Sequence, residues 1–469
     1  MLHDELQAVW GRTRSRYHGP MFGRAAFLGS IAALLFAAGT DMTEYRKSAN
    51  QLIAAALKDD SGLNRLQYLC DRIGNRLSGS KALEQAVSWS EEEMKRAGLA
   101  NVRTIPVKVP HWVRGRESAE MVDPLAKPLF MLGLGGSIAT PPGGITAEVA
   151  VVSDFNQLEK LGRTGVQGKI VLYDAPFVTY DKTVTYRSQG ASRAARLGAV
   201  AALVRSIAPR SLRDPHTGAM NYTDAGPRIP AAAVSVEDAE YLHRLVQSGQ
   251  RVRVHLEMEA HFEPDADSAD VMGEIVGREK PDEIVVIGGH LDSWDVGQGA
   301  HDDGAGAIAA LEAAALIRQA GLHPRRTIRV VFWTNEENGG RGGDEYRKWA
   351  GDQVKKHIAA IEMDGGAETP VGFDLGSKTV PADFRNRAAA IAGLLKSIGA
   401  DKMSVGDGEA DIEPLMNLGV PAFGLRTTMA HYFDYHHSQA DTFDKIVPED
   451  FRKCVAAMAV MSYVLADSE

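Results

Sequence analysis

Residues 43–115 open with apolar spacing typical of helices and continue with an extended pattern. Apolar residues recur three and four positions apart in Thr43–Leu57, Gly62–Ile73 and Lys81–Ala97. Residues on one face of a helix recur at this spacing, so the pattern predicts three helices. From 101 to 115, valines and an isoleucine alternate with other residues, which predicts an extended segment.

From about 118 to 260 the pattern changes to short apolar runs separated by turns. Proline and glycine cluster between Pro124 and Gly144, as is typical of loops and turns. The runs predict strands at Ala147–Val152, Lys169–Tyr173, Ala199–Arg205, Ala231–Val234 and Val252–Met258. We therefore expect a small β-rich module, with short helices and turns between its strands, inserted over residues 118–261.

From 270 onwards, apolar strands alternate with helical patterns. The predicted strands are Val271–Val276, Ile284–Ile287, Thr327–Trp333, Ile358–Met363 and Ala422–Leu425. The predicted helices are Gly304–Ala320, Gly343–Lys355, Ala382–Ile398 and Pro448 to about Leu465. This rhythm indicates an α/β fold with a mixed sheet covered by helices on both faces. Residues 43–117 and 262–469 would form this domain, interrupted by the insert.

The N-terminal segment resembles a secretion signal. Arg24 precedes an uncharged apolar run, Ala25–Gly39, that ends in small residues. The run is shorter than the roughly 20 residues of a membrane span, so we expect a signal peptide within residues 1–40 and a secreted or periplasmic protein. A retained anchor and a core helix are the alternatives. Translation from Met21 would give an ordinary signal sequence, so residues 1–20 are expected to be an upstream start artefact.

Composition excludes several classes of protein. The chain has 469 residues, of which 44% are hydrophobic and 24% charged, as in folded globular proteins rather than disordered ones. A net charge of −9 provides no basic surface for nucleic acid. The two cysteines, Cys70 and Cys454, lie on the apolar sides of predicted helices, so buried free thiols are expected.

Histidines and acidic residues gather in five clusters, most of which directly follow a predicted strand. His290 and Asp292 form the first, and Asp302 with Asp303 opens a predicted helix. Ligands in open α/β sheets bind at the carboxyl ends of strands, so the positions point to a site. A neutral imidazole binds zinc well, and the Asp292 carboxylate could take its other ring proton. One aspartate of the second cluster could cap the helix while the other bridges two cations.

The remaining clusters complete a set of possible metal ligands. Glu336 and Glu337 follow the strand that ends at Trp333, Asp364 follows the next strand, and His436 and His437 lie in a loop. One glutamate could bind metal while its neighbour handles a proton. Each cluster taken singly also fits an ordinary loop or helix cap. Together, nitrogen and oxygen ligands without cysteine favour catalytic zinc.

The order of these clusters resembles the co-catalytic di-zinc exopeptidases, the family of secreted leucine aminopeptidases and glutamate carboxypeptidases. The resemblance covers residues 43–469 and is greatest for the plasma glutamate carboxypeptidase branch. It is carried by GGHLDSWDVGQGAHDDGAG (288–306), NEENGGRGG (335–343), EMDGG (362–366) and HHSQADT (436–442). The insert resembles a protease-associated domain through Val166–Leu172 and Arg196–Val200.

The resemblance implies two Zn²⁺ per chain and a role for each ligand. His290 and Asp364 would hold one ion, Glu337 and His437 the other, and Asp302 would bridge them. Glu336 would be the general base, Asp292 would support catalysis, and the Asp302–Asp303 peptide bond would be cis. His437 is chosen over His436 because it lies four residues before Asp441. The insert would border the site and shape substrate access, and the chain would form a homodimer.

We therefore expect a secreted metallopeptidase that acts on dipeptides or short peptides. A single-zinc glutaminyl cyclase and a catalytically inactive interaction protein on the same fold are the alternatives. The complete ligand set and the presence of Glu336 argue against both. The terminus attacked is left open, because residues 408–411, 426–428 and 432–435 are equally compatible with substrate contact and with ordinary loops.

Overall fold

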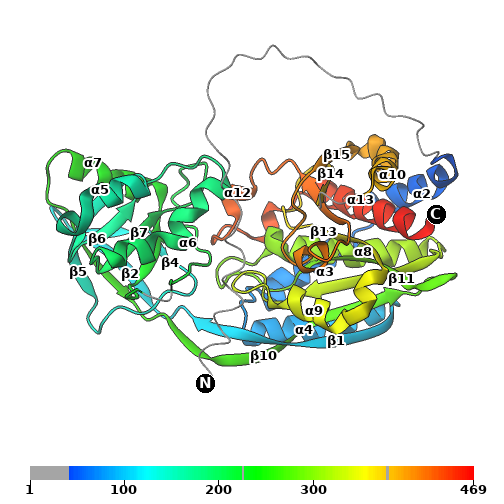
Figure 1. Ribbon diagram of the computed structural model, residues 1–469, viewed down its shortest axis with the longest axis horizontal. Coiled ribbons are helices and arrows are strands. Elements are labelled where there is room, and N and C mark those ends of the chain that lie inside the picture. Colours follow the sequence, from blue (N-terminus) through cyan, green and yellow to red (C-terminus); the bar gives the residue numbers. More distant parts are fainter. Residues whose placement is uncertain (1–41, 224–225, 377–379) are drawn as a thin grey trace, which may run out of the picture. The chain divides into compact units, whose positions relative to one another are not determined.

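The computed structural model describes residues 42–223, 226–376 and 380–469 (Figure 1). The expected signal segment Ala25–Gly39 lies outside these ranges. In these ranges, no helix is both long enough and apolar enough to cross a membrane.

The first sheet is mixed and brings together strands from both halves of the sequence. In the described residues it has eight strands in the order β1-β10-β12-β11-β13-β16-β14-β15. Their bounds are Ala100–Val113 (β1), His261–Ile275 (β10), Lys280–His290 (β11), Arg326–Trp333 (β12), His357–Glu362 (β13), Pro370–Gly376 (β14), Lys402–Val405 (β15) and Ala422–Thr427 (β16). The central strands β12, β11, β13 and β16 run parallel. Strand β10 is antiparallel to β1 and β12, and β14 is antiparallel to β16 but parallel to β15.

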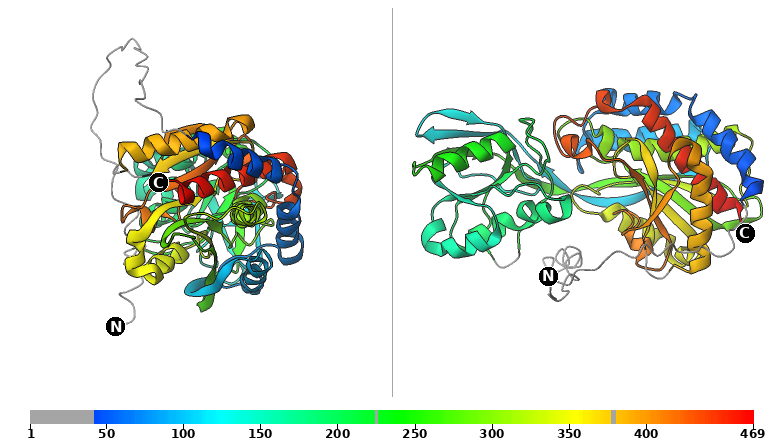
Figure 2. Two further views of the ribbon diagram at one scale, coloured as in Figure 1. Left: turned by 90° about the vertical axis from the view of Figure 1, so that its right-hand side faces the viewer. Right: turned by 90° about the horizontal axis from the view of Figure 1, so that it is seen from above.

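Helices cover both faces of this sheet (Figures 1 and 2). The bounds are Arg46–Ala56 (α2), Ser61–Tyr68 (α3), Lys81–Arg96 (α4), Ala305–Gln319 (α8), Arg341–Ala350 (α9), Ala382–Ala392 (α10), Glu413–Met416 (α11), Tyr432–Tyr435 (α12) and Pro448–Asp467 (α13). Side chains of a strand alternate between faces. Val285 and Ile287 accordingly share a core with α8 and α13, while Val286 packs with Tyr346 of α9. The predicted α/β class is confirmed.

The second sheet takes its strands from residues 117–258. Its order is β3-β2-β9-β5-β6-β7-β8-β4. The strands are Glu117–Asp123 (β2), Lys127–Leu129 (β3), Met131–Gly133 (β4), Ile145–Val152 (β5), Ile170–Tyr173 (β6), Ala201–Arg205 (β7), Ala231–Val234 (β8) and Arg253–Met258 (β9). The helices are Phe155–Val166 (α5), Tyr180–Arg196 (α6) and Val236–Gln247 (α7). Below, "the insert" means these residues, and its likeness to a protease-associated domain stays a prediction.

Sequence patterns located most elements but missed some. All ten predicted strands have counterparts, and Cys70 and Cys454 are buried free thiols as expected. The short strands β3 and β4 lie where proline and glycine predicted loops, and β2, which no pattern predicted, lies just before them. The helix α6, at 17 residues, is longer than the short helices expected in the insert. Its mixed polar and apolar composition hides the helical period. Strands β14 and β15 were missed, since β14 carries two glycines and β15 is largely exposed.

We expect Phe332→Ala to lower the free energy of unfolding by about 3–5 kcal/mol, because it leaves a cavity in the helix-covered core. Phe332 is 0% exposed on β12. The matched control is Phe262→Ala on β10, whose side chain is 53% exposed; it should change stability by no more than about 0.5 kcal/mol. Urea titration of both variants measures the difference, and equal effects would contradict the assigned packing.

Candidate metal centre

Five side chains from distant parts of the sequence converge beside the carboxyl ends of three parallel strands. His290 is the last residue of β11, Glu337 follows β12 and Asp364 follows β13. Asp302 lies just before α8, and His437 lies just after α12. All except Asp364 are buried. The strand ends therefore supply three ligands, and two loops bring the others against them.

Asp302 stands between two groups of ligands and directs one oxygen to each. Its Oδ1 lies 3.2 Å from His290 Nε2, which is 3.5 Å from Asp364 Oδ1. Its Oδ2 lies 3.3 Å from His437 Nε2, which is 3.0 Å from Glu337 Oε2. This places His290 and Asp364 on one side and His437 and Glu337 on the other.

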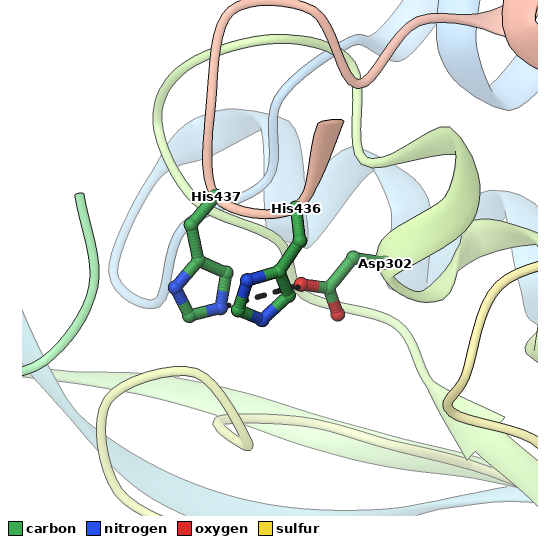
Figure 3. Close-up of side chains that lie close together, drawn as sticks. All are labelled: Asp302, His436 and His437. Carbon is green, nitrogen blue, oxygen red and sulfur yellow. Dashed lines mark ion pairs between the residues drawn. The ribbon is translucent and has the colours of Figure 1, made fainter. Parts of the chain in front are cut away.

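The neighbouring ring of His436 also lies close to Asp302 (Figure 3). Its Nε2 is 3.6 Å from Asp302 Oδ2, and its ring stacks on His437 with centroids 3.6 Å apart. Of the two rings, His437 alone forms an ion pair with Glu337 among the residues that the structure describes. The geometry therefore favours His437 as Glu337's partner, although His436 is near enough to contribute.

The donor atoms fit a pair of zinc ions. Ligands bonded to one tetrahedral zinc at about 2.0–2.2 Å lie about 3.3–3.6 Å from each other, close to the spacings above. The atoms that would bond have no hydrogen-bond partner: His290 Nε2, Asp302 Oδ2, Glu337 Oε1 and Asp364 Oδ1 are all buried. Buried polar atoms without partners are rare, and nitrogen and oxygen donors suit catalytic zinc.

Comparison with known proteins identifies the family. A model described as peptidase family M28 matches residues 270–462. Carboxypeptidase Q of Mus musculus is 41% identical over 453 residues, which is 95% of each chain. This chain belongs to peptidase family M28. The crystal structure of a peptidase M28 precursor from Shewanella amazonensis SB2B is 36% identical, with a TM-score of 0.86 over 91% of this chain and 98% of that one. The zinc aminopeptidase BSAP from Bacillus subtilis shares the fold at 19% identity, with a TM-score of 0.66 over 87% and 95%.

This chain of family M28 is thus a metallopeptidase. The side chains of Asp441 and Asp303 hold the backbone around Asp302 in place. Both oxygens of the Asp441 carboxylate accept backbone hydrogen bonds, from His301 N at 2.7 Å and Asp302 N at 3.1 Å. The Asp303 carboxylate caps α8 by accepting from Gly306 N at 3.0 Å and also accepts from His290 N at 3.1 Å. The predicted capping aspartate is Asp303, and the Asp302–Asp303 peptide bond is cis as expected.

Asp292 supports the turn that carries the two glutamates. Its Oδ1 accepts from Glu336 N at 3.0 Å and its Oδ2 from Glu337 N at 3.4 Å. The ring of His290 does not use this carboxylate as the sequence suggested. Its Nδ1 lies 2.9 Å from the backbone carbonyl of Asp292 and 3.7 Å from the carboxylate. The carboxylate is already occupied by two backbone donors, so the carbonyl is left to orient the imidazole.

Burial and crowding oppose ionisation of both glutamates of the site when no cation is present, whereas, despite burial, the neighbouring His290 and His437 rings hold the pKa of Asp302 well below its ordinary value. Burial raises the pKa of Glu336 and Glu337 well above its ordinary value, and nearby Asp302 adds to both shifts. Burial also lowers the pKa of the His437 ring, which keeps that ring neutral. A neutral imidazole such as that of His437 and the negative charge of clustered carboxylates are both stabilised by divalent cations.

The insert contributes two side chains beside this centre that the sequence did not reveal. The Arg187 guanidinium of α6 lies 3.3 Å from His437 Nδ1 and donates to the Tyr180 hydroxyl at 2.7 Å. The Tyr180 ring stacks on Phe433 and meets His436 edge-on. A single arginine within a helix carries no recognisable motif, so only the folded chain places it here.

Asp292→Asn should lower the stability of the metal-free protein by about 1–3 kcal/mol, because an amide nitrogen cannot accept the second backbone hydrogen bond. Urea unfolding after chelation of metal measures this effect. Asp267→Asn, at an exposed position on β10, is the control and should have little effect. A fully stable Asp292→Asn protein would rule out the supporting role of its carboxylate.

Proposed function

We propose that this M28 metallopeptidase is a secreted exopeptidase that hydrolyses dipeptides or short peptides with two zinc ions and Glu336 as general base. The sharing of Asp302 between two ligand groups carries the proposal. Asp302 lies 3.2 Å from His290 on one side and 3.3 Å from His437 on the other. Its two oxygens can therefore serve different cations.

The ligands would divide between two ions. His290 and Asp364 would hold one, His437 and Glu337 the other, and Asp302 would bridge them. The zinc aminopeptidase from Bacillus subtilis, which shares this fold, supports the choice of zinc. When bound, two zinc ions supply Lewis acidity that lowers the pKa of water and stabilises negative charge on a carbonyl oxygen.

Glu336 is suited to move the proton. Its backbone is fixed by Asp292, and its carboxylate is close enough to His290 and Asp364 to respond to their charges. Burial raises its pKa, which makes it a better proton acceptor than an exposed glutamate. Glu336 would take a proton from the attacking water and later deliver it to the leaving amine, so that the proton count balances over one hydrolysis.

The remaining parts of the proposal rest on sequence. Secretion is supported by the apolar run Ala25–Gly39 after Arg24. Exopeptidase activity is supported by similarity to carboxypeptidase Q, whose name describes an exopeptidase. The homodimer implied by the family stays a prediction that light scattering can test.

Glu336→Gln should lower kcat by about 10²- to 10⁴-fold, because glutamine cannot accept the proton. Zinc content should remain that of the wild type, since Glu336 is not assigned as a ligand. Kinetics on a cleaved dipeptide, together with elemental analysis, measure both quantities. Glu345→Gln on the surface of α9 is the matched control and should leave turnover unchanged. Near-normal turnover of Glu336→Gln would refute the assigned base.

Purified protein should contain two zinc ions per chain and cleave free dipeptides, and a chelator should abolish cleavage. Dipeptides blocked at the amino or carboxyl end identify the terminus that is recognised, because only one blocking group should prevent cleavage. A single bound zinc would favour the glutaminyl cyclase alternative. Two ions with no hydrolysis across a dipeptide panel would contradict exopeptidase activity.

A further inference from the structure

The loop that carries His437 is held on one side by a segment of the insert, Asp214–Gly218, called the strap below. The strap's Thr217 N donates to the His437 carbonyl oxygen at 2.8 Å. One residue further along the loop, the Ser438 hydroxyl donates to the Asp214 carboxylate at 2.6 Å. The strap therefore contacts the backbone of the predicted zinc ligand and the side chain next to it.

The strap is itself fixed to the insert. Thr217 Oγ1 donates to the Gly133 carbonyl at the end of β4 at 2.7 Å, and His216 N donates to Ser206 Oγ at 3.1 Å. Gly218 O accepts from Gly135 N at 3.0 Å. These three bonds tie successive strap residues to different parts of the insert. The strap that contacts the His437 loop is therefore anchored to the insert at several points.

Arg187 supports the strap beside the ring. Its Nη1 donates to the Thr217 carbonyl at 3.1 Å, and its side chain is 6% exposed. A side chain on Gly218 would place a Cβ 2.3 Å from the Arg187 guanidinium carbon, so the strap packs directly on this group. The His437 Nε2 atom lies 3.3 Å from Asp302 Oδ2 and 3.0 Å from Glu337 Oε2, on the side of the ring toward the other ligands.

The loop needs such support because His437 has an unfavourable backbone conformation. Its φ is 60°, in the left-handed region that residues with a side chain rarely adopt. Such conformations persist where surrounding contacts over-determine them. Here Thr217 N donates to the carbonyl oxygen of His437 itself, and the bond to Asp214 comes from the next residue, Ser438.

We propose that the strap positions His437. The insert would then complete the zinc site formed by His437 and Glu337, called the second zinc site below, rather than only border the substrate. This inference rests on the proposed di-zinc function. The residues involved act through His437 and need not touch substrate. Partners that orient a metal-ligating histidine typically contribute about 10- to 100-fold to metal affinity.

The test is stepwise zinc titration of metal-free protein, with wild type, Asp214→Ala and Ser438→Ala compared by calorimetry. Each substitution removes the hydrogen bond between Ser438 and Asp214 without altering a ligand, and the backbone bond from Thr217 N to His437 remains. The zinc affinity of the second zinc site should fall about 10-fold or more, while that of the site formed by His290 and Asp364 stays within about 2-fold. Asp214→Asn should restore the second affinity, because its amide oxygen still accepts from Ser438.

Arg205→Gln is the matched control for general loosening of the insert. Arg205 pairs with Asp174 and Glu240 within the insert. Its loss should leave both zinc affinities unchanged. Absorption of the cobalt-substituted protein gives a second readout, since a displaced His437 alters the ligand field of one site alone.

The outcomes separate the inference from the function on which it rests. If wild type binds two zinc ions and both strap variants, folded by circular dichroism, keep the second affinity, the positioning role is wrong. An equal loss in Arg205→Gln would also overturn it. If wild type itself binds fewer than two zinc ions, the proposed function fails before the strap is tested.

Discussion

The site depends on one carboxylate that serves two sides at once. Asp302 lies within 3.3 Å of a histidine on each side. Each of these histidines in turn contacts one further carboxylate, that of Asp364 or of Glu337. Much of the surrounding backbone is organised to hold this residue, through the carboxylate of Asp441 and the helix cap made by Asp303. Burial raises the pKa of Glu336 and Glu337, so the binding of cations, which favours the ionised carboxylates, would be accompanied by the release of protons.

The α/β sheet explains how residues far apart in sequence meet. The parallel strands β11, β12 and β13 end at the same edge of the sheet. A candidate metal ligand lies at or shortly beyond the end of each strand. Gly288 of β11 pairs with Val331 of β12 and with Glu362 of β13, and this register aligns the strand ends that place His290, Glu337 and Asp364. Precision at the site is a property of the buried strands, whereas His437 depends on a loop.

Sequence patterns predicted the strand ends well because each combines an apolar run with an acidic residue or histidine. His290, Glu337 and Asp364 could be found in this way. The choice between His436 and His437 could not be made from local chemistry, since the two histidines are adjacent in sequence. In the structure His437 lies nearer to Asp302, and of the two it alone forms an ion pair with Glu337 among the described residues. Asp292 lies beside the two glutamates, but its carboxylate does not bond the His290 ring as the sequence suggested. Whether a carbonyl or a carboxylate meets the His290 ring depends on backbone geometry that residue types do not encode.

The pairing of β1 with β10 has a structural consequence for the residues between them. Val113 lies opposite His261, so the chain leaves and re-enters the first sheet at neighbouring points. The intervening stretch is thus topologically an enlarged hairpin connection, and the two strands would still be joined if it were exchanged for another module of any length. Evolution could therefore change the residues between β1 and β10 without changing the first sheet. A domain that replaced them would begin and end at the same edge of that sheet.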